Sequence, residues 1–134
     1  MIQVNVSIRP TEWKACRKWR ESFKSNMTDA MWRALNALHS RIRLNLSGPS
    51  HTKFPGNGNP FPGVVTGRLR NSVTAQLESY GTEFRGIVGP DVWYAINHEL
   101  GRGVPMRPYL APAFKKERQY VRRVLEVAIK ESFE

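Results

Sequence analysis

The segment His98-Glu99-Leu100-Gly101-Arg102 comes closest in this sequence to a catalytic motif. In the zinc motif HExxH, two histidines four residues apart on a helix bind the metal while the glutamate activates water. Here Arg102 stands where the second histidine is needed, and a guanidinium, which is always charged, cannot coordinate a cation. Gly101 also disfavours the helix that the motif requires. The segment therefore predicts an ordinary turn, with no metal bound.

Other catalytic arrangements are also missing from the sequence. The chain has three histidines and one cysteine, Cys16, so it offers neither a CxxC pair nor an internal disulfide. No G-x-S-x-G segment is present to expose a nucleophilic serine. The glycine pairs at residues 56–58 and 101–103 lack the strand, helix and lysine of a phosphate-binding loop, which indicates turns. We therefore expect a protein that is not an enzyme and needs no cofactor.

Charge is the most unusual bulk property of the chain. Its 134 residues include 21 Lys and Arg against 11 Asp and Glu, a formal net charge of +10. Nine basic and three acidic residues fall in residues 1–46, four of each in residues 47–101, and eight and four in residues 102–134. The excess of positive charge toward both ends predicts an acidic partner.

Five basic residues near the C-terminus are candidate phosphate contacts. The interleaved Glu117 and Glu126 are also typical of a solvated helix with ion pairs between its turns. No recognition helix, zinc finger or RNA-binding aromatic strand is visible, so sequence-specific nucleic-acid binding is not expected. The candidates are Lys115, Lys116, Arg118, Arg122 and Arg123.

Alternation of apolar and polar residues predicts three strands. Apolar residues alternate from Ile2 to Ile8, as in a half-buried strand, and Pro10 ends the run. The same pattern recurs from Val73 and is followed by a turn at residues 80–82. Residues 84–88 then form the returning strand of a hairpin.

Apolar residues spaced three and four apart predict three helices. Residues 10–23 fit a helix that ends or bends near Ser25 and Asn26, and residues 27–45 fit a second, longer one. Pro112 suits the first turn of a long C-terminal helix. The apolar stripes expected on these helices are Trp13, Cys16, Trp19 and Phe23; Met27, Met31, Ala34, Leu35, Leu38, Ile42 and Leu46; and Phe114, Val121, Leu125, Ala128, Ile129 and Phe133.

Glycine and proline separate these elements. Residues 47–66 contain four Gly and four Pro and predict a long exposed loop, in which Phe54 and Phe61 are candidate partner contacts. Residues 93–100 are expected to form a turn of helix followed by loop. With 40% hydrophobic residues and no long apolar run, the chain predicts one α+β domain and no membrane contact. In it, a small antiparallel sheet is packed by N-terminal helices and a long C-terminal helix. Tryptophans expected as core or interface anchors are Trp13, Trp19, Trp32 and Trp93.

Three segments in the second half of the chain share their order and spacing with a known protein family. The segments are Pro62-x-x-x-Thr66-Gly67-Arg68-Leu69-Arg70-Asn71-Ser72-Val73, Tyr94-Ala95-x-x-x-Glu99-x-Gly101 and Arg107-Pro108-Tyr109-Leu110-x-Pro112-Ala113. With the hairpin between the first two, this arrangement resembles the tail-completion or neck proteins of long-tailed bacteriophages. The likeness spans nearly the whole chain. It departs from the family pattern at residues 63–65, in a longer loop before Pro62, and at Tyr109, where Phe is commoner.

The resemblance implies a structural role in virion assembly at the head-to-tail junction. Proteins of this family associate as a ring, a hexamer by this resemblance, which closes the tail end and docks to the connector below the portal and to the tail tube. DNA passes through the lumen without being read, so basic residues facing it would contact phosphate non-specifically. The protein would be made in the host cytoplasm and end in the virion.

Other functions stay open at this point. The chain could be a minor tail component placed elsewhere in the tail, or an accessory protein that binds DNA non-specifically. A metal-dependent hydrolase is the third alternative, and stoichiometric zinc in the purified protein would favour it.

Physical roles can be assigned to the residues that carry the resemblance, and most of these roles concern the fold. Gly67 is expected to supply a backbone angle that other residues avoid. Glu99 is expected to form an ion pair with Arg68, Arg70 or Arg107 and so to tie the base of the hairpin to the terminal helix. Proline at position 108 is expected to set the entry of that helix.

Overall fold

The structure, a computed structural model, describes residues 1–7, 17–81 and 83–132 of the chain. Expectations for the following residues lie outside the part that is described: Ile8, Pro10, Trp13, Cys16, the side chain of Trp19, and Phe133.

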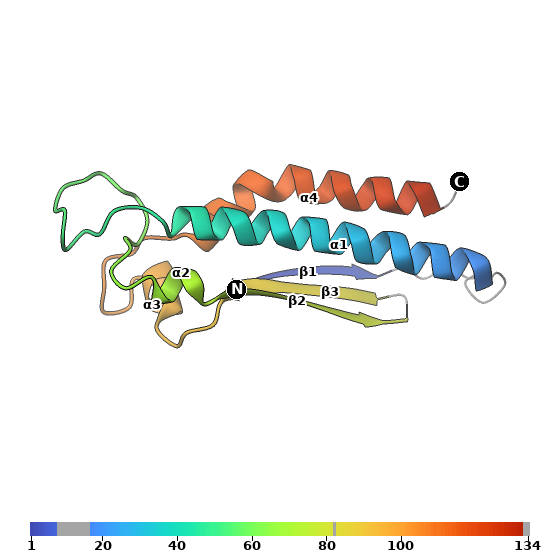
Figure 1. Ribbon diagram of the computed structural model, residues 1–134, viewed down its shortest axis with the longest axis horizontal. Helices are drawn as coiled ribbons and strands as arrows, with labels where there is room; N and C mark the ends of the chain where they lie inside the picture. The colour runs from blue at the N-terminus through green and yellow to red at the C-terminus, as the bar shows by residue number, and fades with distance from the viewer. Residues whose placement is uncertain (8–16, 82, 133–134) are drawn as a thin grey trace.

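Three strands and two long helices form the body of the molecule (Figure 1). The strands are β1 (Ile2–Ser7), β2 (Val73–Tyr80) and β3 (Glu83–Pro90), which make one antiparallel sheet in the order β1-β3-β2. The helices are α1 (Arg17–Asn45), α2 (Arg68–Asn71), α3 (Ala95–Leu100) and α4 (Leu110–Ser132). The expected α+β fold is confirmed: α1 lies along the small sheet, and the long C-terminal helix runs antiparallel to α1 (Figure 1).

The sheet has one apolar and one polar face, as the alternation predicts. Val73 and Phe84 are buried beneath the helices, and Val4 packs against the same core. On the other face, Gln3 and Gln76 are exposed. Because only one face is buried, a shift of one residue in the pairing would exchange the two faces, and the apolar pattern therefore fixes the register.

Helix α1 approaches the central strand closely at Gly86. A Cβ atom at this position would lie 2.8 Å from Cδ2 of Leu35 and 3.1 Å from Cε of Met31. Carbon atoms do not pack at the shorter of these separations. The glycine therefore lets the helix lie directly on the sheet, where both side chains become fully buried.

Helix α1 is continuous, so the predicted break near Ser25 and Asn26 is wrong. Phe23 lies on the same face as Met27 and is fully buried, so the helix covers more apolar surface by continuing than by ending. The Asn26 side chain donates from Nδ2 to Oγ of Ser132 at 3.2 Å. This bond joins the middle of α1 to the end of α4, and no second helix begins there.

The two long helices are also joined near the other end of their contact. Nε of Arg41 donates to Oε1 of Glu117 at 3.0 Å, and both side chains are largely withdrawn from solvent. Nδ2 of Asn45 donates to the carbonyl oxygen of Tyr109 at 3.1 Å, and this bond is buried. The pairing of α1 and α4 is therefore fixed by polar bonds at both ends as well as by the apolar core.

The apolar stripe of α4 begins with Leu110 and Ala113, and not at Phe114 as predicted. Val121 and Ala128 are buried as expected, whereas Phe114 is 36% exposed. Leu110 and Ala113 fill the inward-facing positions of the first turn and pack in the core, which leaves Phe114 at its margin. Pro112 lies in the first turn, as predicted.

Residues 47–66 form an irregular segment, as predicted, with hydrogen bonds of its own. The N–H of Val64 donates to the carbonyl of Gly48 at 3.0 Å and closes the loop near its ends. Nδ2 of Asn57 donates to the carbonyl of Phe54 at 2.8 Å. Bonds from asparagine side chains to the backbone are typical of stable turns. The loop projects beyond the sheet at the end where α2 and α3 lie (Figure 1).

We predict that Leu38→Ala lowers the free energy of unfolding by about 2–5 kcal/mol, because it leaves a cavity in a well-packed core. Leu38 is fully buried on α1. The control Leu44→Ala removes the same atoms from the same helix, but Leu44 is 62% exposed. Its effect should stay within about 0.5 kcal/mol. Urea denaturation followed by circular dichroism measures both, and equal losses would contradict this assignment of the helix faces.

Candidate assembly interface

The three segments that carry the resemblance meet at one end of the molecule. Helices α2 and α3 and the chain leading into α4 gather at the end of the sheet where β1 begins, beside the loop of residues 47–66 (Figure 1). We call this region, residues 62–72 and 93–113, the motif end. The contacts in this region determine which residues of the segments bond within the chain and which face solvent.

Residues 66–72 form a turn that starts strand β2. Gly67 precedes α2 with φ of +79°, in the left-handed region that glycine adopts without strain, as predicted. Oγ1 of Thr66 accepts a hydrogen bond from the N–H of Arg68 at 3.3 Å. Oγ of Ser72 donates to the carbonyl of Leu69 at 2.7 Å. These residues therefore shape the backbone and are occupied by local bonds.

Glu99 binds the backbone of α4, and the predicted ion pair with Arg68, Arg70 or Arg107 is not formed. Its Oε2 accepts hydrogen bonds from the N–H groups of Tyr109 at 2.7 Å and Leu110 at 3.1 Å, and Oε1 accepts one from Ala111 at 3.2 Å.

The N-terminal N–H groups of a helix have no acceptor within the helix and carry a partial positive charge. The carboxylate of Glu99 accepts hydrogen bonds from these N–H groups and carries the opposite charge, so Glu99 caps the helix. Glu99 does connect two of the segments, but it does so through backbone N–H groups at the start of α4 and not through an arginine side chain.

Tyr109 links three helices from a fully buried position. Its hydroxyl donates to the carbonyl of Ala95 in α3 at 2.9 Å, and its own carbonyl accepts the bond from Asn45 of α1. Burial raises the pKa of Tyr109 well above its ordinary value, and the negative charge of Glu99 adds to the shift. The phenol therefore stays protonated as a donor. A phenylalanine here would leave the Ala95 carbonyl without this partner.

Gly101 ends α3 in a way that no other residue could match easily. It has φ of +73°, and its N–H bonds to the carbonyl of Asn97. A Cβ atom would lie 2.8 Å from Cβ of Met106. The N–H of Arg107 then donates to the carbonyl of His98 at 2.9 Å. The glycine therefore allows the chain to fold back along α3 before α4 begins.

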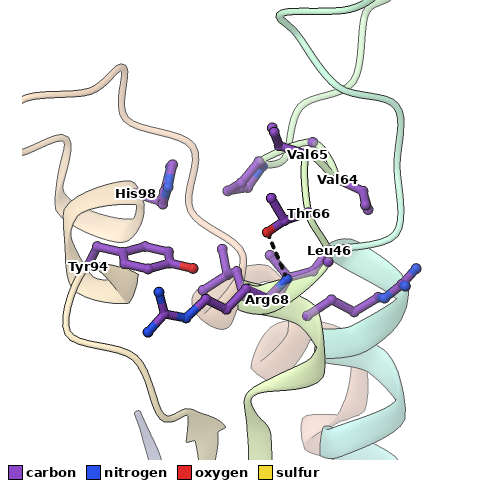
Figure 2. A pocket seen from close by; sticks show the side chains of 12 residues that line it. Leu46, Val64, Val65, Thr66, Arg68, Tyr94 and His98 are labelled. Atoms are coloured by element: carbon purple, nitrogen blue, oxygen red, sulfur yellow. Dashed lines mark hydrogen bonds between the residues drawn. The ribbon is translucent and has the colours of Figure 1, made fainter.

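A small cavity of about 120 Å³ lies between residues 62–70 and α3 (Figure 2). The guanidinium of Arg68 lies over the ring of Tyr94, 5.8 Å from its centroid, which is a cation–π contact. The ring of His98 packs edge-on to Tyr94, and its Nδ1 is buried with no hydrogen-bond partner among the residues that the structure describes. Burial lowers the pKa of His98, and the positive charge of Arg107 lowers it further. The imidazole is therefore neutral near pH 7.

A larger, apolar groove of about 370 Å³ lies at the same end. Trp93 is 81% exposed beside it, and Ile96 and Leu100 are each 50% exposed. Tyr109 and Leu110 also line it, so the groove lies over the capped start of α4. Exposed apolar side chains grouped around a hollow are typical of protein contact sites. This groove is the strongest candidate interface of the motif end.

Sequence reasoning found Trp93 only as one of four anchor candidates and missed Ile96 and Leu100. The one signal in the sequence was the spacing of three and four residues between Trp93, Ile96 and Leu100, which is typical of one face of a short helix. The segment was too short for its periodicity to be distinguished from chance.

The other residues predicted to contact a partner lie outside this groove, in the loop of residues 47–66 and on α4. Phe54 is 59% exposed in the loop, which suits a partner contact. Phe61 is partly buried and packs against the main core of its own chain, so its expected role as a contact is not supported. The five basic residues predicted as phosphate contacts are all exposed on α4.

Comparisons of the chain with protein family models, with curated proteins and with solved structures found no match. Among the residues that the structure describes, no three His, Cys, Asp or Glu side chains are grouped to hold a metal ion. No described helix is both long and apolar enough to cross a membrane. The assignment of a function therefore depends on the geometry above and on the resemblance of the three segments.

We predict that Glu99→Ala lowers the free energy of unfolding by about 1–3 kcal/mol, because three N–H groups at the start of α4 lose their acceptor. Glu126→Ala is the control, since that exposed carboxylate pairs with Arg122 within α4 and with no other described residue. Thermal and urea unfolding measure both variants. A Glu99→Ala protein as stable as wild type would show that water replaces the carboxylate at no cost.

A second prediction concerns acid and His98. Because the pKa of His98 is lower in the folded protein than its ordinary value of 6.5, the unfolded chain takes up a proton first as the pH falls. Stability should therefore be lost below about pH 6.5. Urea denaturation at about pH 7.5 and 5.5 should show a larger loss in wild type than in His98→Gln. Equal losses would mean that the imidazole is accessible to protons in the folded state.

Proposed function

We propose that this protein is a structural, non-enzymatic subunit of a long-tailed bacteriophage virion, which acts at the head-to-tail junction as a tail-completion or neck protein. The ordered likeness of residues 62–113 to that family supports the proposal. One observation carries it: the three segments meet at one end of the molecule. Hydrogen bonds through Glu99 and Tyr109 join the second segment to the third, and Arg68 of the first lies over the ring of Tyr94 in the second. Contact between the segments agrees with their acting as one unit, as the resemblance implies.

On this proposal, the groove beside Trp93 is the surface that contacts a neighbouring virion protein. A large aromatic ring that is held in place but exposed gains much buried area when a partner covers it. Trp93 packs edge-on against Tyr94, with ring centroids 5.5 Å apart, so part of the cost of orienting it is met before binding. Ile96 and Leu100 supply apolar surface around it.

We further propose that copies of the subunit form a closed ring, a hexamer by the resemblance, between the connector and the tail tube. The net charge of +10 on each copy opposes association of free subunits. Salt or an acidic neighbour weakens this repulsion. Assembly is therefore expected on the docking partner more readily than in dilute solution.

A minor tail component placed elsewhere in the tail would use the same groove. The two roles are therefore distinguished by where the subunit lies in the virion. Labelling of the subunit in intact virions, viewed by electron microscopy, places it either at the neck or along the tail. Genes for portal, capsid and tail-tube proteins beside its own gene would support either virion role. Neither observation is expected for a metal-dependent hydrolase.

We predict that Trp93→Ala prevents the subunit from binding purified tails while its melting temperature stays close to that of wild type. The residue is 81% exposed, so little packing within the chain is lost. Tyr80→Ala is the control, because Tyr80 is also exposed but lies at the far end of the hairpin. Sedimentation with and without tails, at low and high salt, measures binding and ring formation. Monomeric wild-type protein under every condition, tails included, would refute the ring.

A further inference from the structure

The solvent-facing side of α4 carries a dense group of positive charges, which we call the cationic face. Within the described chain, only one of its residues has an ion pair: Nε of Arg122 lies 2.9 Å from Oε1 of Glu126. The opposite side of the helix is buried in the core that it shares with α1, so these charges cannot turn inward. The cationic face consists of Lys115, Lys116, Arg118, Arg122, Arg123 and Lys130, all exposed.

A groove lined by several hydrogen-bonding side chains lies beside this face, between α4 and α1. Its volume is about 420 Å³, and it is lined by Arg33, Asn36 and Ser40 of α1 and by Tyr120 of α4, together with Ala37 and Glu117. Within the described parts of the chain, the side chains of Arg33, Asn36, Ser40 and Tyr120 have no hydrogen-bond partner. The groove therefore offers unoccupied donors next to the cations.

The one carboxylate in the groove is already neutralised. Glu117 is bound by Arg41 at 3.0 Å. From Lys115 to Arg123 the helix carries five cations and this single carboxylate. The local field at the surface is thus strongly positive, and an anion approaching it meets little repulsion.

We propose that the cationic face and this groove bind the sugar-phosphate backbone of double-stranded nucleic acid without reading its sequence. Lysine and arginine would neutralise successive phosphates, and the amide and hydroxyl groups of Asn36, Ser40 and Tyr120 would donate to phosphate oxygens. The cations extend from Lys115 to Lys130, a distance of about 22 Å along a helix. Over this length a duplex carries several phosphates, so more than one of the cations can contact phosphate at the same time.

A nucleic acid fits this surface better than an acidic protein does. Contact sites for proteins usually have an apolar or aromatic centre from which water is excluded. Four of the side chains that line this groove are charged or carry hydrogen-bonding groups, beside Ala37 and the ring of Tyr120 at its edge. The larger group of exposed apolar side chains around a groove lies elsewhere, at the motif end. The inference rests on these charges and donors alone, and it stands or falls independently of the proposed place in a virion.

Binding of a fluorescent duplex, measured by anisotropy over a range of salt, tests the proposal. With about four or five phosphates neutralised, the logarithm of the binding constant should fall with the logarithm of the salt concentration with a slope of about −4. Two duplexes of equal length and different sequence should bind within about twofold of each other, since the contacts are to phosphate. The double variant K116Q/R123Q should reduce the slope by about two and weaken binding at least about tenfold.

The control variant K53Q/R102Q removes the same charge from exposed positions away from α4 and the groove. It should keep the slope of the wild type. Equal weakening in both variants would show that only the total charge matters, and no binding at low salt would exclude the site; either result overturns the proposal. Displacement of the duplex by polyglutamate of equal charge at equal concentration would assign the face to an acidic protein instead. Both variants should melt like wild type, which keeps folding defects apart from binding defects.

Discussion

Helix α4 begins where a carboxylate from another helix meets its free N–H groups. The residue before the helix is Tyr109, whose side chain cannot accept these bonds as Ser, Thr, Asp or Asn would at this position. Glu99 of α3 accepts them instead. The cap is therefore a tertiary contact, and α4 has a defined start only when α3 is packed beside it. The start of α4 therefore depends on the packing of α3 as well as on the residues of α4 itself.

Much of the motif end follows from this cap. Tyr109 can be buried because its N–H, its carbonyl and its hydroxyl all have partners, on α3 and α1. Gly101 turns the chain after α3 so that Glu99 faces the start of α4. Glu99 and Tyr109, which carry part of the resemblance, thus bond within the chain, while Trp93 and Ile96, close to Glu99 in the sequence, face outward. A short helix can serve the fold on one side and a partner on the other because successive residues point in different directions.

The two proposed surfaces act through different forces and use different residues. Attraction between the cationic face and phosphate extends over roughly a Debye length, about 8–10 Å at moderate salt. Burial of the Trp93 groove contributes only on contact. On these proposals, a subunit could hold a protein neighbour at its end and a duplex along α4 at the same time. The groove would set the stability of assembly, and the charges would set how it depends on salt.

Periodicity in the sequence determined the α+β class, the hairpin, and the buried face of α1 from Met27 to Ile42, because a helix or strand must bury whichever side is apolar. The positive φ at Gly67 was also predictable, since only glycine adopts that angle without strain. The break near Asn26 was predicted wrongly because local propensity favours a helix end there. Burial of Phe23 and the bond to Ser132 outweigh that propensity.

Only the tertiary structure decided which donors Glu99 would meet. A carboxylate accepts equally well from a guanidinium or from the backbone, and spacing along the chain does not specify which of them comes within hydrogen-bond distance. The same holds for Trp93 and for Phe61, which the sequence presents as similar aromatic candidates. Packing of distant segments exposed the first at the motif end and placed the second against the core. Burial is a property of the assembled chain, because it depends on what the rest of the molecule places beside each side chain.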